Sequence, residues 1–211
     1  MLLMWLAATQ VVAQNVWERP QDESATIQKQ SVKAKKIEKE NKDAKYLRGA
    51  VPTVNGNVEW VLDVDVPGKS AQQIYDRMYA ILMDLTRSEG QLEGSGLALV
   101  NKQDHIVVAG VREWLVFSNS FLSLDRAKFY YTLVARCSDG HLNLTMNHIA
   151  YKYDENGKMQ SYKAEDLITD DEAVNKKNTR LYKGTGKFRR KTIDRKDYLF
   201  RKVQELVQKD I

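Results

Sequence analysis

Four apolar stretches separated by short turn sequences fill the middle of this chain and constrain its fold most. Each stretch reads as a strand bounded by turn-forming residues. Asp139-Gly140, between the last two stretches, is a strong hairpin signal. Consecutive strands joined by short turns form an antiparallel meander. The expected strands cover residues 97–101, 106–118, 127–137 and 142–153.

A further strand and a helix precede this meander. Apolar residues alternate along the sequence from Val58 to Val66, which predicts a strand with one buried face. Ser70 is the expected N-cap of a helix, and Gly90 is expected to supply a positive φ at its end. The apolar positions of this helix recur at helical spacing: Ile74, Met78, Ile81, Leu82 and Leu85.

The segment after the meander, residues 154–190, is polar and is expected to be irregular apart from a short helix over 164–168. Asp194 is the expected cap of a final helix within residues 191–208. The order β-α-β-β-β-β-α predicts an α+β fold, an antiparallel sheet with two helices on one face, because this arrangement buries both amphipathic helices. The other face of the sheet is then open to water or to a partner. Three acidic residues of the first strand are expected on it: Glu59, Asp63 and Asp65.

The composition narrows the class of protein. With 211 residues and a hydrophobic fraction of 43%, the chain is long and apolar enough to bury a core as one domain. Its one cysteine excludes an internal disulfide, a cysteine-rich zinc site and an iron–sulfur cluster. The formal net charge of +5 conceals an uneven distribution. Residues 49–175 hold 11 basic and 18 acidic side chains, whereas residues 176–211 hold 13 basic and four acidic ones.

The first 13 residues form an uncharged apolar run that predicts a signal peptide. The run is too short for a membrane span, which needs about 20 apolar residues. Val11 and Ala13 have the spacing of small residues before a cleavage site, so we expect cleavage after Ala13. A buried N-terminal helix is the alternative. Because the only cysteine, Cys137, lies far from this site, we expect an exported periplasmic or extracellular chain without a lipid anchor or a transmembrane segment.

A charged leader, residues 14–45, is expected between the signal peptide and the domain. Its Lys, Gln, Glu and Ala residues favour helix. Its only sizeable apolar residues beyond position 24 are Ile27, Val32 and Ile37, which form too thin a stripe to be buried firmly. We therefore expect a fraying helix or a flexible segment, followed by a single α+β domain over residues 46–211.

Two short motifs resemble a known family. The segments KYLRGAVPTVNGNVEW, residues 45–60, and SAQQIYDRM, residues 70–78, are similar to a family of uncharacterised secreted proteins from Bacteroides-type bacteria. That family is a domain of unknown function with a TATA-binding-protein-like fold. The resemblance covers residues 46–153 and implies the same order of strands and helices. It implies no established activity and no catalytic residues, and the fold name alone does not imply DNA binding.

No nucleotide-binding or calcium-binding motif is complete. The sequence GTGK at 184–187 departs from a phosphate-binding loop, because Leu181 replaces its first glycine and Phe188 replaces its Ser or Thr. We expect a flexible loop there. The carboxylates expected on the open face, with Asp63 and Asp65 two positions apart, lack a surrounding glycine-containing calcium loop, so we expect them to keep that face hydrated.

The histidines and the cysteine are expected to be structural. His105, His141 and His148 lack a second metal ligand at a useful spacing, so we expect hydrogen-bonded roles and no metal or cofactor. His148 shares strand parity with apolar residues, which predicts a half-buried ring. Cys137 is expected to be buried as a small hydrophobic residue.

The strongest charge feature is a basic run near the C-terminus that includes Phe188. Basic residues interleaved with an aromatic residue are able to bind a nucleic acid backbone, anionic lipid or polysaccharide. A solvated surface is the alternative, and the export signal argues against nucleic acid. The run consists of Lys187, Arg189, Arg190, Lys191, Arg195 and Lys196.

These observations favour an exported, non-enzymatic cell-envelope protein that binds an unknown protein or envelope ligand through the open sheet face. Two alternatives stay open. One is an enzyme whose site assembles from distant residues, with His148 and nearby tyrosines as candidates. The other is anion or nucleic-acid binding through the basic run.

Overall fold

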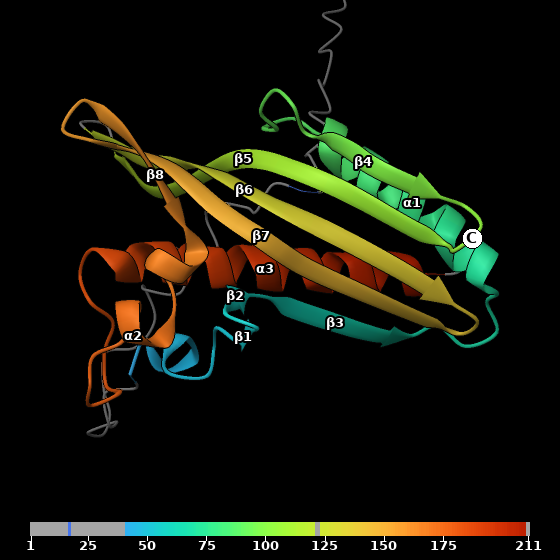
Figure 1. Cartoon of the computed structure of the whole chain (residues 1–211), viewed down its shortest axis with the longest axis horizontal. Coiled ribbons are helices and arrows are strands. Elements are labelled where there is room, and N and C mark those ends of the chain that lie inside the picture. Colours follow the sequence, from blue (N-terminus) through green and yellow to red (C-terminus); the bar gives the residue numbers. More distant parts are fainter. Residues whose placement is uncertain (1–16, 18–40, 121–122, 210–211) are drawn as a thin grey trace, which may run out of the picture.

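The structure, a computed structural model, describes residues 17, 41–120 and 123–209. Its main element is a six-stranded antiparallel sheet, and two long helices, α1 (Ala71–Arg87) and α3 (Thr185–Gln208), lie against one face of it (Figure 1). Both helices lie behind the strands in Figure 1, so the opposite face points toward the viewer. This confirms the predicted α+β class with two helices on one face of an antiparallel sheet.

The strands of the main sheet include the five that the sequence predicts. The six strands of the main sheet are β3 (Trp60–Asp65), β4 (Gly96–Asn101), β5 (Ile106–Ser120), β6 (Ser123–Ser138), β7 (His141–Glu155) and β8 (Lys158–Lys163). The connection between the expected strands 106–118 and 127–137 is shorter than predicted, because β5 extends to Ser120 and β6 begins at Ser123. The strands β1 (Thr53–Val54) and β2 (Asn57–Val58) form a separate two-stranded antiparallel sheet. The shorter elements are η2 (Ala44–Tyr46), η3 (Ala164–Asp166) and α2 (Asp170–Ala173).

The long strand β7 organises the sheet. The strand order is β3-β7-β6-β5-β4, and β8 also pairs with β7. β3 pairs with the first part of β7, from Asp65 opposite His141 to Trp60 opposite Met146. β8 pairs with the second part, from Ala150 opposite Lys163 onward. Residues 147–149 of β7, between these two pairings, therefore have no partner strand on that side in the described chain.

Helix α1 forms as the sequence predicts. The Ser70 side chain accepts a hydrogen bond from the backbone N–H of Gln73, and the Gln73 side chain accepts one from the backbone N–H of Ser70. This capping box satisfies two N–H groups that the first helical turn leaves without partners. The five predicted apolar residues of the helix are all buried against the sheet.

Helix α3 begins at Thr185, earlier than predicted. Asp194 lies inside the helix instead of capping it, and residues 185–187 form its first turn instead of a flexible loop. Phe188 explains the early start, because it is buried between Phe117 and Tyr151, with ring centres 4.6 and 5.2 Å away. Aromatic burial of this kind contributes more than local helix propensity does.

The segment 154–190 is more ordered than the sequence predicts. It contains β8, η3 and α2 in addition to the start of α3. β8 escapes prediction because nearly all its residues are exposed, so no apolar alternation marks it. The turn before β8 does have a sequence signal, the dipeptide Asn156-Gly157. Both residues adopt positive φ angles, as this type of turn requires.

Trp17 is the one described residue before position 41, and it is docked on the helices. Its side chain is 2% exposed, and its indole Nε1 donates to Asp84 of α1 at 2.6 Å. Its backbone carbonyl accepts from Arg195 of α3, also at 2.6 Å. The predicted signal peptide, residues 1–13, and most of the predicted leader, residues 14–45, lie outside the described residues.

Candidate functional site

The acidic residues expected on the open face lie there and are paired with β7. Asp63 and Asp65 are exposed, and Glu59 is half-buried. Asn143 donates to Asp63 at 2.8 Å, and the His141 ring lies within 3.3 Å of Asp63 and 3.2 Å of Asp65. Hydrogen bonding to Asp65, followed by that to Asp63, raises the pKa of His141. These carboxylates therefore act as cross-strand partners on the open face.

A β-bulge in β7 brings His148 to the same face. Tyr130 pairs with Ala150 and Thr132 with Asn147, so Tyr131 of β6 faces two residues of β7. His148 has a φ of +50°, a left-handed conformation that is uncommon for residues other than glycine. A bulge shifts strand parity by one residue. The ring is consequently exposed, and the prediction of a half-buried His148 is wrong.

A chain of hydrogen bonds fixes the His148 ring. The Asn147 side-chain amide donates to Glu59 Oε2 at 3.1 Å, and its Oδ1 lies 2.8 Å from His148 Nδ1. An ionised carboxylate only accepts, so the amide nitrogen of Asn147 must face Glu59 and its oxygen must face His148. His148 Nδ1 is therefore the donor, and Nε2 of the neutral ring is an acceptor.

His148 lines a shallow depression of about 370 Å³ on the open face. The floor is low because Gly96, Gly110 and Thr132 lie side by side on β4, β5 and β6. Gly94 has a φ of +86°, a conformation that favours glycine, and a β-carbon there would meet the Arg112 guanidinium in its present position. The lining includes Gly94, Gly96, Ala98, Gly110, Arg112, Tyr130, Thr132 and His148.

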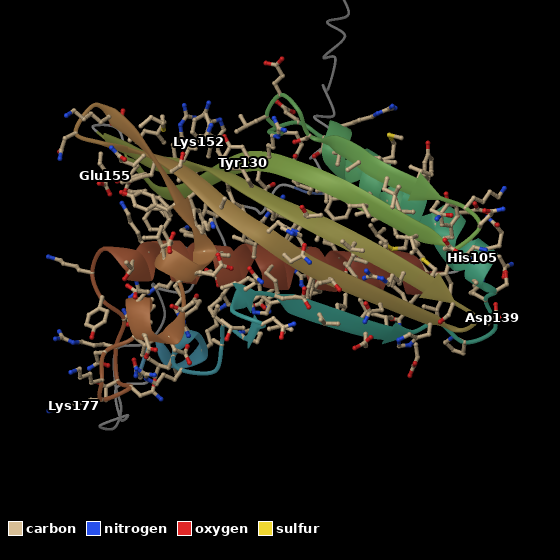
Figure 2. The ribbon with its side chains drawn as sticks, viewed as in Figure 1. His105, Tyr130, Asp139, Lys152, Glu155 and Lys177 are labelled. Atoms are coloured by element: carbon tan, nitrogen blue, oxygen red, sulfur yellow. The ribbon has the colours of Figure 1, made fainter. Side chains whose placement is uncertain are left out.

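Cations and aromatic rings continue from this depression toward the far end of the sheet. Lys152 Nζ lies 5.8 Å from the centre of the Tyr130 ring, and Figure 2 shows the two residues near one another on β6 and β7. Lys128 lies directly opposite Lys152 in the β6–β7 register. Arg126 stacks on Trp114 at 3.7 Å, and Lys128 Nζ lies 5.9 Å from the same ring. Among the described residues, no carboxylate oxygen lies within 4 Å of the charged nitrogens of these three cations.

The basic run of α3 forms no comparable open surface. Arg189 is 0% exposed and donates to the carbonyls of Tyr46, Leu47 and Ile168 and to Asp170. Burial lowers the pKa of its guanidinium, and Asp170 opposes that effect. Arg189 thus ties three segments of the domain together and is closed to an external anion.

Four of the other five cations of the run also have internal partners. Lys187 bonds to Asp125 and to the Tyr153 hydroxyl, and Arg190 bonds to Asp43. Arg195 pairs with the buried Glu113, Lys196 contacts Asp197, and Lys191 is half-buried. Most of the cations of the run are therefore engaged in contacts within the domain.

The remaining candidates, Cys137 and His105, pack within the domain. The Cys137 side chain is buried, and burial raises the pKa of its thiol to about 12. The His105 ring packs edge-on against Tyr75, with ring centres 5.9 Å apart. Within residues 41–120 and 123–209, no group of three or more His, Cys, Asp or Glu side chains is placed to hold a metal ion.

The surroundings of His148 have no signal in the periodicity of a single strand. The bulge depends on the pairing of β6 with β7, which single-strand periodicity does not reveal. The outward residues of β6 do have such a signal: Lys128, Tyr130 and Thr132 alternate with buried residues, so they share the outward face.

An antiparallel sheet with both long helices on one face, and no described helix on the opposite face, defines the class of this domain as a TATA-binding-protein-like fold. The family model described as "Domain of unknown function (DUF4468) with TBP-like fold" matches residues 60–152. Among the residues that the structure describes, no helix has the length and hydrophobicity needed to cross a bilayer.

Two solved structures are similar to this chain. A DUF4468 family protein from Bacteroides ovatus ATCC 8483 is 34% identical, with a TM-score of 0.74, over 80% of this chain and 96% of its own. A TBP-like protein from Parabacteroides distasonis ATCC 8503 has the same fold at 22% identity, with a TM-score of 0.61, over 76% of this chain and 99% of its own. A search of curated proteins found no match. The chain belongs to the DUF4468 family, which confirms the resemblance identified from its two motifs.

Proposed function

We propose that this protein is an exported, non-enzymatic cell-envelope protein that binds a ligand through the open face of its sheet. The observation that carries the proposal is the depression beside His148. Its histidine is held in a left-handed conformation by a bulge and oriented through Asn147 and Glu59. Strained positions and bulges of this kind gather at binding and catalytic sites.

The assignment as non-enzymatic rests on the chemistry around His148. Nucleophilic catalysis requires a nucleophile within hydrogen-bond reach of its base. Among the described residues, the Asn147 amide is the hydrogen-bond partner of the His148 ring, and no hydroxyl or thiol bonds to it. Export is supported by the apolar run at residues 1–13.

Filling the depression tests the binding proposal. A β-carbon on Gly110 would meet no atom within 4 Å, so Gly110→Val fits the strand while occupying the depression. Saturation-transfer NMR would compare the two proteins against a panel of soluble saccharides, nucleotides and short peptides. We expect at least one class to bind the natural protein and to lose binding in Gly110→Val. Binding that is the same in both proteins would contradict the proposal.

The ligand panel also tests the non-enzymatic assignment, and a mass measurement tests export. Chemical conversion of a panel compound by the natural protein, with none in Gly110→Val, would show an enzyme. The mass of the protein recovered from the periplasm or medium of expressing cells should lack residues 1–13. An intact Met1 in a cytosolic fraction would contradict export.

A further inference from the structure

We propose that the ligand of this site is an acidic saccharide, whose anionic group lies between Lys128 and Lys152 and one of whose hydroxyls donates to His148 Nε2. The inference rests on the proposed function, because it names the ligand class of the same site.

The lysine pair identifies the ligand as an anion. Lys128 and Lys152 are direct cross-strand partners, and like charges in that arrangement destabilise a sheet. Within the described chain, no carboxylate oxygen lies within 4 Å of the charged nitrogen of either lysine, and Arg126 adds a third cation beside Trp114. An anionic group between the two ammonium groups relieves their repulsion and accepts charge-assisted hydrogen bonds.

The histidine identifies the ligand as a hydroxyl donor. Because Glu59 orients Asn147 and Asn147 accepts from His148 Nδ1, the neutral imidazole keeps Nε2 as an acceptor. Tyr130 is common to both parts of the site, because it lines the depression with His148 and the Lys152 ammonium lies over its ring. A ligand that carries hydroxyls and a carboxylate on neighbouring rings satisfies both ends of the site.

The shape of the site agrees with a saccharide. A volume of about 370 Å³ is near the lower end of the range of about 300–1,000 Å³ for small-molecule sites. The glycine floor, Gly96 and Gly110, lets a ring approach the backbone closely. A nucleic acid fits less well, because single-stranded bases need free aromatic platforms and Arg126 already stacks on Trp114.

Isothermal titration calorimetry with three probes tests the inference on the full mature protein. The probes are oligogalacturonate, a neutral galactose oligomer of the same length, and an oligothymidylate that supplies charge without a saccharide hydroxyl pattern. We expect oligogalacturonate to bind at least about tenfold more tightly than either of the others. Lys152→Gln should weaken that binding about tenfold, the loss expected for one charge-assisted hydrogen bond. His148→Gly should weaken it to a similar extent.

A matched control separates site-specific contacts from net charge. Lys177→Gln removes the same charge from an exposed residue on the α2–α3 connection, far from Lys152 in Figure 2, and should leave binding unchanged. Equal loss of binding in Lys177→Gln and Lys152→Gln would overturn the inference.

The other outcomes separate the ligand class from the proposed function. If the neutral oligomer binds, and Gly110→Val abolishes that binding while Lys152→Gln does not, the acidic ligand is overturned and the proposed function stands. Preferential binding of the oligothymidylate would overturn it in favour of nucleic acid. Absence of binding by all three probes would also overturn it, and the wider panel would then decide the proposed function.

Discussion

Arg195 of α3 forms a bidentate ion pair with Glu113 of β5, with distances of 2.8 Å from Nε to Oε1 and 2.6 Å from Nη2 to Oε2. Both side chains are largely buried. Tyr131 also donates to Glu113, and the carbonyl of Trp17 accepts from Arg195. One ion pair thus joins the sheet, the helix layer and the N-terminal segment.

Removing one member of this pair should destabilise the domain strongly. Arg195→Met leaves the Glu113 carboxylate buried without its cation, and we expect a loss of about 3–5 kcal/mol in the free energy of unfolding. Urea denaturation followed by circular dichroism measures it. The double variant Arg195→Met/Glu113→Gln should recover much of the loss, because it removes the unpaired charge. A double variant as unstable as Arg195→Met would contradict the pairing.

His148→Gly should separate stability from binding. A left-handed conformation costs a residue with a β-carbon about 1–2 kcal/mol, and glycine avoids that cost. The variant loses one exposed hydrogen bond to Asn147, so we expect its unfolding free energy to be unchanged or about 1 kcal/mol higher. Chemical denaturation measures this change. A loss above about 1 kcal/mol would show that the ring is needed for folding and not for a ligand.

The stability of the β3–β7 edge should depend on pH through His141. Its pKa is raised by hydrogen bonds to Asp65 and Asp63. A raised pKa means that the folded state binds the proton more tightly, so this contribution is complete below the ordinary pKa of about 6.5 and disappears as the pH rises through the folded value. NMR titration of the His141 ring should give a lower pKa in Asp65→Asn than in the natural protein. Equal values would contradict the contact.

Cys137 should react slowly in the native state. Burial raises the pKa of its thiol to about 12, so the thiolate is scarce at neutral pH and the side chain is inaccessible. Its reaction with a chromogenic disulfide reagent should be at least about tenfold slower in buffer than in urea. A native rate equal to the rate in urea would show that the cysteine is exposed.

The central strands of the sheet and α1 are predictable from the sequence, because the spacing of their apolar residues is a local, periodic signal. The capping residue Ser70 and the apolar spacing after it determine a helix with little help from the rest of the chain. The start of α3 was not predictable in this way, since it depends on Phe188 packing against rings from β5 and β7. The exposed strand β8 carried no apolar pattern at all.

The candidate site depended on pairing between distant segments. The sequence predicts Glu59 on the open face, whereas its contact with Asn147 joins residues 88 positions apart and has no local signal. The partners of the basic run are distant in sequence for the same reason: Arg190 bonds to Asp43, which lies 147 positions away. The positions of the charged residues are evident from the sequence, whereas the fold determines which of them form ion pairs and which face solvent.

Amide chemical-shift mapping with oligogalacturonate tests the central claim most directly. Spectra of the mature protein would be recorded during titration, with the neutral galactose oligomer as the control. We predict that the largest shifts fall on Gly110, Tyr130, Thr132, His148 and Lys152, around the depression on the open sheet face. Shifts confined to α1 and α3 would contradict a binding site on the open face.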